Sequence, residues 1–380
     1  MKKYSVAHIH SDKKFLQLGD AFFSAEFNNK LIFIGDKIDT TGKFENDIHF
    51  FEKNKNSVAK IIGACKDIDL VIFYSLDEIA IKIILELPKK NKIGWRFFGF
   101  ELYARHREKY ITNTTQAIID EGNILNNSSF VYGAKSKLRF ILKLYQKHLF
   151  LKAISRCNLF FGLYEEEYLM LKIEYLNLPH FIPVSLNMDF LQTKSLSDEK
   201  KEKYILIGNN RNLWNNHLDI LEIIKRNKNG GDYKAKLLLN YGNRGYYYKK
   251  LMQFASSIKD VELIEEFMSI EDFDKLYLKC AALVINSKRQ MAGNNIRKAL
   301  EHGTKVYLNT ANSFYEYLKN NNFVVFNIQE FESDFLTGNF LLNKESAQHN
   351  FNQLIELTKK NSDKIFRNNV LKFLESDIKS

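Results

Sequence analysis

The chain has 380 residues, of which 45% are hydrophobic, so it is long enough for two domains with packed cores. Its three cysteines are far apart in the sequence, which argues against a disulfide framework or a zinc site and fits a reducing cytoplasm. The net charge of +11 predicts an anionic partner but does not say whether it is a nucleic acid, a lipid head group or a phosphorylated small molecule. No apolar stretch approaches the roughly 20 residues that span a bilayer, so we expect a soluble or peripheral protein.

Short apolar runs rich in β-branched and aromatic residues alternate with helical patterns along the chain. In the first half, buried strands of a parallel sheet are predicted at residues 4 to 9, 31 to 35, 69 to 74 and 93 to 98. In the second half they are predicted at residues 203 to 208, 235 to 240, 281 to 286, 304 to 308 and 322 to 326. This alternation predicts α/β domains with helices on both faces of open parallel sheets.

A polar, non-periodic stretch at residues 185 to 202 indicates the domain boundary. We therefore expect an N-terminal domain over residues 1 to 190 and a C-terminal domain over residues 200 to 345. The apolar spacing beyond predicts helices over residues 346 to 380 that could cross back to the N-terminal domain. Two doubly wound, Rossmann-like domains facing across a cleft would bind ligands at the carboxyl ends of their strands.

Candidate catalytic side chains follow strand ends in the first half. His8, His10 and Asp12 end the first strand, and Glu101 follows the fourth. A carboxylate there could act as general base toward a hydroxyl nucleophile if burial raises its pKa, which makes Glu101 the first candidate and Asp12 the second. The alternatives are a surface pair of Glu101 with Arg105, one helical turn away, and histidines that are only packed and hydrogen-bonded.

A basic stretch covers residues 134 to 156, which contain many Lys and Arg residues and no acidic one. Apolar residues lie between them, a composition typical of an amphipathic helix on an anionic membrane surface. The predicted membrane contacts are Lys135, Lys137, Arg139, Lys143 and Lys147. The alternative is a solvated crossover helix that packs on the sheet. A nucleic-acid partner is not expected, because no RNP, KH, helix-turn-helix or zinc-finger pattern accompanies the charge.

Two glycine-asparagine corners follow predicted strands in the second half. The first contains Gly208, Asn209, Asn210 and Arg211, and the second contains Lys288, Arg289, Gln290, Gly293, Asn294 and Asn295. A strand that ends at such a corner and starts a helix aims backbone N–H groups and a positive dipole end at a ligand, which suits a diphosphate. The basic side chains would neutralise its charge and so replace a metal ion. The alternative is an ordinary capped crossover helix.

Further candidates flank these corners. Tyr241 and Gly242 follow another strand, and Glu301 lies two helical turns beyond the second corner, where it could reach a ribose hydroxyl. For the run of tyrosines at residues 246 to 248 we favour packing at a helix start over a binding role. No cofactor and no metal are expected.

Several pieces of the chain stand in a recognisable order. They are Trp95, Phe98-Gly99-Phe100-Glu101-Leu102-Tyr103, Phe181-Ile182-Pro183, Met188-Asp189, Ile207-Gly208-Asn209, Tyr241-Gly242 and the loop from Arg289-Gln290 to Gly293. In their order and spacing they resemble the 4-acetamido-4,6-dideoxygalactose (Fuc4NAc) transferases of enterobacterial common antigen synthesis, glycosyltransferase family 56. Residues 111 to 133 look like an insertion relative to that family.

The resemblance implies a GT-B fold, with an acceptor-binding N-terminal domain and a nucleotide-sugar-binding C-terminal domain. It implies transfer of Fuc4NAc or a related fucose-like sugar from a nucleoside diphosphate, with dTDP favoured, to a polyprenyl-diphosphate-linked saccharide in bacterial surface polysaccharide synthesis. The enzyme would act in the cytoplasm, peripherally on the inner face of the plasma membrane. Two alternatives stay open: a nucleotide-sugar 2-epimerase on the same fold, and a non-catalytic module that binds anionic lipid or nucleic acid.

Overall fold

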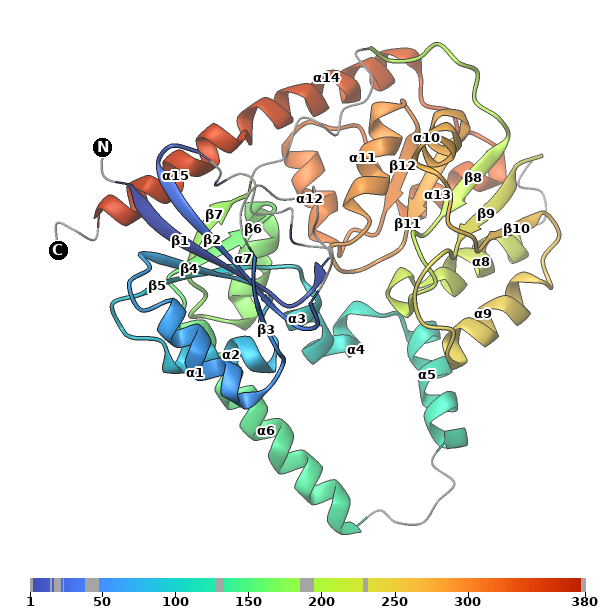
Figure 1. Cartoon of the computed structure of the whole chain (residues 1–380). Coiled ribbons are helices and arrows are strands. Elements are labelled where there is room, and N and C mark those ends of the chain that lie inside the picture. Colours follow the sequence, from blue (N-terminus) through green and yellow to red (C-terminus); the bar gives the residue numbers. More distant parts are fainter. Residues whose placement is uncertain are drawn as a thin grey trace. The chain divides into compact units, whose positions relative to one another are not determined.

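The computed structural model divides the chain into two compact units (Figure 1). The N-terminal unit comprises Met1–Leu102, Val131–Asn187 and Lys360–Ser380, and the C-terminal unit comprises Tyr103–Phe130 and Met188–Lys359. The structure describes residues 3–13, 16, 22, 24–37, 48–126, 133–184, 195–227 and 232–376. For residues 126 and 133–140 it describes the backbone and not the side chains.

The N-terminal unit is built on a parallel sheet whose seven described strands run in the order β3-β2-β1-β4-β5-β6-β7. The strands are β1 Tyr4–His10, β2 Phe27–Ile34, β3 Ile48–Phe51, β4 Leu70–Tyr74, β5 Lys92–Arg96, β6 Leu159–Gly162 and β7 His180–Pro183. The helices are α1 Lys55–Ala64, α2 Glu78–Glu86, α3 Phe100–Tyr103 (which ends at the unit boundary), α6 Gly133–Arg156, α7 Glu165–Glu174 and α15 Asp363–Ser376. One face of the sheet is covered by α15, whose Phe366, Val370 and Leu374 join the core cluster of the strands.

The C-terminal unit repeats the plan with six described parallel strands in the order β10-β9-β8-β11-β12-β13. The strands are β8 Tyr204–Ile207, β9 Lys234–Leu238, β10 Val261–Ile264, β11 Ala282–Ile285, β12 Lys305–Leu308 and β13 Phe326–Asn327. The helices are α4 Arg107–Tyr110, α5 Asn113–Asn126, α8 His217–Arg226, α9 Tyr246–Ala255, α10 Ile270–Lys279, α11 Gly293–Glu301, α12 Ser313–Asn320, α13 Ile328–Thr337 and α14 Lys344–Lys360. The predicted class, two doubly wound Rossmann-like α/β domains, is confirmed.

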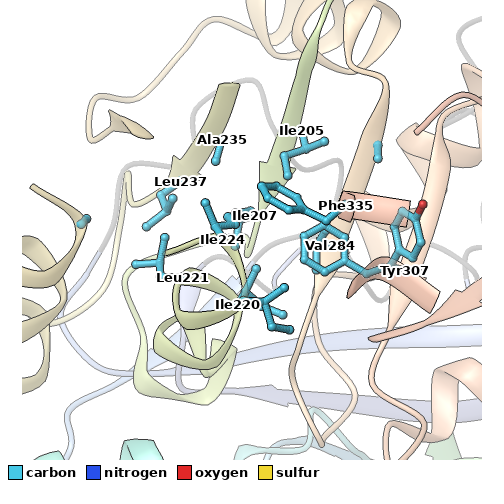
Figure 2. Close-up of a cluster of buried hydrophobic side chains, with 14 of the residues drawn as sticks. Ile205, Ile207, Ile220, Leu221, Ile224, Ala235, Leu237, Val284, Tyr307 and Phe335 are labelled. Atoms are coloured by element: carbon cyan, nitrogen blue, oxygen red, sulfur yellow. The ribbon is translucent and has the colours of Figure 1, made fainter. Parts of the chain in front are cut away.

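The core of the C-terminal unit explains why these segments take their structures. Ile205 and Ile207 are two residues apart on β8 and therefore point to the same face of the sheet. Leu221 and Ile224 of α8 pack with them in one core cluster (Figure 2). Strand β8 is buried along its whole length, as expected for a central strand of a parallel sheet covered on both faces.

The chain crosses between the units more often than the predicted boundaries allow. Residues 103–130, which the sequence placed in the N-terminal domain, belong to the C-terminal unit. The final residues from Lys360 belong to the N-terminal unit, so the return of the C-terminal helices applies to α15 and not to α14.

Candidate functional site

The carboxyl edge of the C-terminal sheet brings the two glycine-asparagine corners together. β8 lies between β9 and β11, so the direction of strand order reverses between β8 and β11. The loops that follow these two strands leave the same edge because the strands are parallel. In open α/β sheets this switch point is where ligands bind. The sheet order therefore makes both corners parts of one candidate site.

Gly208 makes a turn at the end of β8 that requires glycine. Its φ is +70°, and a Cβ atom added there would lie 2.5 Å from Nε2 of His217. The backbone N–H of Asn209 donates to Oδ1 of Asn215 at 3.2 Å. This amide is thus bound inside the protein, so it is not an open donor for a phosphate as the sequence suggested.

Buried asparagine side chains fix the geometry of the corners. Asn215 Nδ2 donates to the backbone oxygen and to Oδ1 of Asn210, at 3.0 and 3.1 Å. Asn216 and Asn286 each donate to the other's backbone oxygen, at 3.0 and 3.2 Å, and Asn309 donates to Asn286 Oδ1 at 2.8 Å. Buried amides need such partners. This network joins the loops after β8, β11 and β12, so its asparagines position the site.

Arg211 lies inside this scaffold as well. The residue is 6% exposed, and its Nε donates to the backbone oxygen of Leu239 at 2.7 Å. Its backbone N–H donates to the oxygen of Tyr241 at 2.9 Å, and its guanidinium lies 5.4 Å from the ring centroid of Tyr248. The predicted role of Arg211 on a diphosphate therefore fits the structure less well than a role in holding the loop after β9.

The second corner starts α11 without a capping side chain. The N-cap residue is Ala292, in the left-handed conformation with φ 63°, and it makes no side-chain cap hydrogen bond. The helix begins with Gly293, Asn294 and Asn295, and the first N–H groups of a helix have no acceptor within it. A Cβ atom on Gly293 would meet only Gln290 Nε2, at 3.6 Å. This helix end suits an anion, which would accept the amides and complement the dipole.

Arg289 is held beside this helix start by two aromatic rings. Its guanidinium carbon lies 5.3 Å from the ring centroid of Tyr103 and 5.1 Å from that of Trp214. Such stacking orients the planar donors of an arginine. Lys288 instead donates to the backbone oxygen of Ile111 at 3.2 Å, which ties the loop to the segment before α5. Of the predicted cations, Arg289 is thus the one best placed for a diphosphate.

Tyr241 and Gly242 turn the chain at the end of β9, next to the first corner. Gly242 has φ +113°, and Asn209 Nδ2 lies 3.3 Å from the hydroxyl of Tyr241. Tyr241 is 44% exposed, so its ring is accessible to a ligand. Tyr247 instead lies in the core cluster, as favoured for the tyrosine run.

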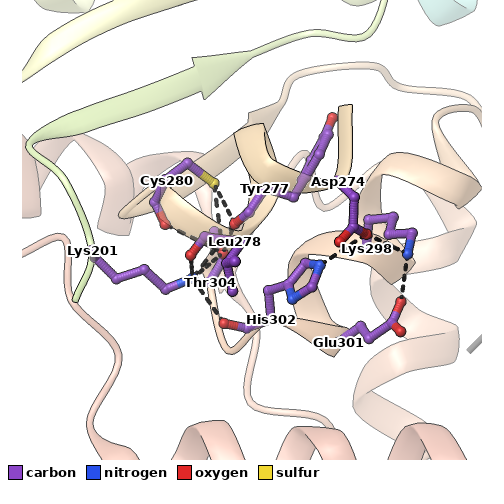
Figure 3. A network of polar contacts seen from close by, with 9 residues as sticks. All are labelled: Lys201, Asp274, Tyr277, Leu278, Cys280, Lys298, Glu301, His302 and Thr304. Atoms are coloured by element: carbon purple, nitrogen blue, oxygen red, sulfur yellow. Dashed lines mark hydrogen bonds and ion pairs between the residues drawn. The ribbon is translucent and has the colours of Figure 1, made fainter. Parts of the chain in front are cut away.

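Glu301 lies in a buried polar network at the other end of α11 (Figure 3). Its side chain is 0% exposed and pairs with Lys298 at 3.2 Å, and Lys298 also pairs with Asp274 at 2.6 Å. His302 Nε2 lies 3.1 Å from the same Asp274 carboxylate. In the same region Lys201 donates to the backbone oxygen of His302 at 2.8 Å. Glu301 is thus engaged within the protein, and its predicted contact with a ribose stays a prediction.

In the N-terminal unit Glu101 is the carboxylate whose pKa is most relevant to catalysis. The residue is 6% exposed, and burial raises its pKa to about 7 although Trp95 Nε1 donates to Oε1 at 3.3 Å. The nearby charge of Arg96 lowers the pKa and only partly offsets the burial. Arg105, the surface partner considered above, is exposed. The condition set for a general base, a pKa raised by burial, is therefore met.

The polar residues at the end of β1 take different positions. His8 is buried and lies 3.0 Å from the hydroxyl of Tyr74 and 2.9 Å from Oδ1 of Asn29, and burial lowers its pKa to about 4. His10 stacks on Tyr74, with ring centroids 3.8 Å apart. Both histidines are therefore packed. Asp12, the second candidate base, is half-buried.

Among the described side chains of the basic helix α6, the buried ones lie in its C-terminal part. Phe150, Ala153 and Ile154 are buried, and the helix contacts α2. The turns before them expose Ile141, Leu142, Leu144 and Tyr145 together with Lys143 and Lys147. The side chains of Lys135, Lys137 and Arg139 lie outside the described residues.

Acidic pairs and long helices are the features of the described ranges of residues that bear on metal and membrane binding. Two Asp-x-Asp pairs occur in the sequence, and each is engaged within the fold: Asp69 accepts from the backbone N–H of Ser5 at 2.8 Å, and Asp274 pairs with Lys298. No three His, Cys, Asp or Glu side chains gather there in a way that would hold a metal ion. Nor does any helix in those ranges combine the length and apolarity needed to cross a membrane. Met188 and Asp189 lie outside them.

The sequence reading missed the segment before α5. Thr112 N–H donates to Asn216 Oδ1 at 3.0 Å, and its hydroxyl donates to Asp219 Oδ2 at 2.7 Å. Two other residues of this segment contact the second corner: the ring of Tyr103 lies next to Arg289, and the backbone oxygen of Ile111 accepts from Lys288. The one sequence signal for the aromatic surroundings of Arg289 was Trp214, an aromatic residue within a run of asparagines.

Comparison with known proteins supports the fold. No family model matches the chain, and no curated protein matches it in sequence. Among solved structures, a glycosyltransferase from Rickettsia africae superposes with a TM-score of 0.61 at 12% identity, over 100% of both chains. Anabaena HepE in complex with UDP gives 0.61 at 11% identity, over 98% of this chain and 100% of the other.

A third solved structure, described as a UDP-N-acetylglucosamine 2-epimerase of Listeria monocytogenes, gives 0.51 at 13% identity, over 99% of this chain and 97% of the other. At these identities the similarity establishes the fold alone. The chain has the GT-B fold, built from two Rossmann-like units.

Proposed function

We propose that the protein is a glycosyltransferase that takes its sugar from a nucleoside diphosphate held by the C-terminal unit. The observation that carries this proposal is the start of α11, which lacks a capping side chain and lies at the switch point of the sheet. Arg289, stacked between Tyr103 and Trp214, supplies a fixed cation beside it. The structural similarity to Anabaena HepE, which is described in complex with UDP, supports a nucleotide as ligand.

In the proposed reaction a hydroxyl oxygen of the acceptor forms a bond to the anomeric carbon of the donor sugar. The bond between that carbon and the diphosphate oxygen breaks, and the nucleoside diphosphate leaves. Glu101 takes the proton of the hydroxyl, for which its raised pKa suits it, and Asp12 is the second candidate. Arg289 and the N–H groups of Gly293 to Asn295 stabilise the charge that develops on the leaving diphosphate, so no metal ion is required.

The finer assignment follows the resemblance to glycosyltransferase family 56. It makes the donor a dTDP-linked Fuc4NAc or a related fucose-like sugar and the acceptor a polyprenyl-diphosphate-linked saccharide of a bacterial surface polysaccharide. The exposed apolar and basic turns of α6 support an acceptor of this kind, because they would place the enzyme on the anionic inner face of the plasma membrane.

The membrane contact is tested by flotation with vesicles that contain anionic lipid. Exchanging both Lys143 and Lys147 for Glu should release the protein from these vesicles, since each lysine near such a surface contributes about 1 kcal/mol. Exchanging the exposed pair Lys89 and Lys90 for Glu makes the same change of charge elsewhere and serves as the control. Equal release by both double variants would remove α6 from this role.

The transfer itself is tested by incubating the purified protein with dTDP-, UDP- and GDP-linked sugars and a polyprenyl-diphosphate disaccharide. Release of nucleoside diphosphate that requires the lipid-linked acceptor, and a product that gains one sugar, would support the proposal. Consumption of none of the donors would overturn it.

The structural similarity to the Listeria epimerase makes epimerisation of a nucleotide sugar the second candidate reaction. A nucleotide-sugar 2-epimerase would convert its donor without any acceptor and would not release nucleoside diphosphate as a stoichiometric product. Conversion of the donor in the absence of acceptor would therefore favour that reaction over transfer. A non-catalytic module would bind lipid or nucleic acid and consume no donor.

A further inference from the structure

Two exposed aromatic rings lie together at the carboxyl edge of the C-terminal sheet, and the proposed catalytic steps use neither ring. Tyr241 follows β9 and Phe267 follows β10, and these two strands are neighbours. Their ring centroids are 6.3 Å apart with an interplanar angle of 18°. Tyr241 is 44% exposed and Phe267 is 77% exposed. A stacked pair of aromatic side chains that stays open to solvent at a ligand-binding edge indicates a surface for a flat ligand.

The pair is held by the first corner of the candidate site. Arg211 N–H donates to the backbone oxygen of Tyr241 at 2.9 Å, and Asn209 Nδ2 lies 3.3 Å from the hydroxyl of Tyr241. A Cβ atom on Gly242 would lie 2.9 Å from Cγ of Arg211, so the turn that carries Tyr241 packs closely on that corner. The position of the ring is thereby coupled to the loop after β8.

One polar atom beside the pair has no partner. Asn209 is 7% exposed, and its Oδ1 is buried and accepts no hydrogen bond. An acceptor buried without a partner carries a desolvation cost, which a ligand can relieve by donating to it. The atom belongs to the same side chain that contacts the Tyr241 hydroxyl, so this buried acceptor without a partner belongs to a residue that contacts the aromatic pair.

We propose that Tyr241 and Phe267 stack on the nucleobase of the donor and that Asn209 accepts a hydrogen bond from its nucleoside. This rests on the proposed function, which puts the diphosphate at the start of α11, and it extends the same site to the base. Nucleobases have flat π faces that stack on aromatic side chains, and such stacking does not depend on charge. Thymine, uracil and guanine each have a ring N–H that can donate to Asn209 Oδ1, whereas the matching ring nitrogen of cytosine is an acceptor and only its exocyclic amino group donates.

The test is calorimetric titration of the full chain with UDP, dTDP, GDP, CDP and inorganic pyrophosphate. Phe267→Ala should weaken the preferred nucleoside diphosphate by roughly tenfold, the order expected for loss of one base–aromatic stack, and leave pyrophosphate binding unchanged. Phe267 is so exposed that its replacement should not disturb folding. Leu336→Ala removes another exposed apolar side chain, from α13, and should bind like the wild type.

Two further results belong to the same series. The wild type should prefer UDP over CDP, and Asn209→Leu should lose this preference. If Phe267→Ala and Tyr241→Ala both bind nucleoside diphosphates as tightly as the wild type, the aromatic pair does not hold the base and the inference is wrong. If the wild type binds pyrophosphate and nucleoside diphosphates equally, the base has no site and the inference fails while the diphosphate site stands. If the wild type binds none of these ligands, the proposed function itself fails.

Discussion

The main chemical feature of the N-terminal unit is Glu101, a buried carboxyl group that loses its proton less easily than an exposed one. Glu101 is buried, and Trp95 Nε1 donates a hydrogen bond to its carboxylate at 3.3 Å. Burial disfavours the charged form more than this donor and Arg96 favour it, so the pKa rises from the ordinary 4.5 to about 7. A base with such a pKa is half-deprotonated near neutral pH, where general-base catalysis is most efficient.

The same burial predicts that Glu101→Gln separates activity from stability. Turnover should fall by about 10²- to 10⁴-fold, because the proton acceptor is lost, while nucleotide affinity stays the same. In the wild type the unfolded chain loses the proton near pH 4.5 and the folded chain near pH 7. Between these values the folded state binds more protons, so its stability falls as the pH rises. Glu101→Gln should therefore be more stable than the wild type at pH 8, by up to about 3 kcal/mol, and similar at pH 4.

Urea unfolding at pH 4 and pH 8 measures this difference, with transfer assays on the same samples. Glu86→Gln, at an exposed position on α2, is the control and should change neither quantity. The assignment is contradicted if Glu101→Gln retains turnover or loses nucleotide binding.

At the scale of single residues the sequence could propose positions but not their surroundings. Glu101, Arg289 and Gly293 were proposed because they follow strand ends or start a helix, which can be read from the pattern. Asn210 accepts from Asn215, and Glu301 pairs with Lys298, which in turn pairs with Asp274, 24 positions earlier in the chain. Such side-chain partners are set by the fold and cannot be read from spacing.

At the scale of elements, the two glycines of the candidate site have different tasks. Gly208 has φ +70°, and a Cβ atom added there would lie 2.5 Å from His217 Nε2, so a side chain at this position would be strained and crowded. Gly293 lies in the first turn of α11, where an added Cβ would find space. The two positions therefore offer a matched pair of Gly→Ala substitutions.

We expect Gly208→Ala to lower the free energy of unfolding by at least about 1–3 kcal/mol, the usual cost of a strained backbone conformation. Its crowding against His217 should also displace the corner and weaken nucleotide binding. Gly293→Ala should keep the stability of the wild type or raise it slightly, since alanine has the higher helix propensity. Urea midpoints compare the variants, and equal midpoints would show that the turn at Gly208 tolerates a side chain.

Element prediction succeeded for several strands that are buried along their whole length and missed β10, which is partly exposed. β1, β4, β8 and β11 were each predicted within a residue or two, because buried parallel strands appear as continuous apolar runs. β10 was missed, since Val261–Ile264 is a partly exposed edge strand whose apolar residues are interrupted by Glu262. A short run interrupted by a charge does not separate a strand from a loop.

At the scale of the whole molecule, the C-terminal unit includes a segment from the first third of the chain. α5 packs against α8 and α9, Ile118 joins the core cluster, and Glu121 pairs with Lys250 at 2.8 Å. The sequence could not predict this exchange, because residues 111 to 133 looked like an insertion and their partners lie over a hundred residues later.

This exchange predicts that residues 195–359 alone are an incomplete unit. The fragment should be less stable than the same unit in the full chain, and a synthetic peptide of residues 103–126 should raise its midpoint of thermal unfolding in a concentration-dependent way. A peptide carrying Thr112→Val and Ile118→Asp should have little effect. A fragment that unfolds at the same temperature with and without the peptide would contradict the packing described here.

The central claim, a nucleoside diphosphate site at the start of α11, is tested most directly by calorimetric titration of the wild type and Arg289→Ala with dTDP, UDP and GDP, with and without EDTA. We predict micromolar binding of at least one nucleotide, with dTDP favoured, unaffected by EDTA and lost in Arg289→Ala. Arg226→Ala, which removes an exposed arginine that pairs with Glu332, should bind like the wild type. Binding of none of the three nucleotides, or equal binding by Arg289→Ala and the wild type, would contradict the claim.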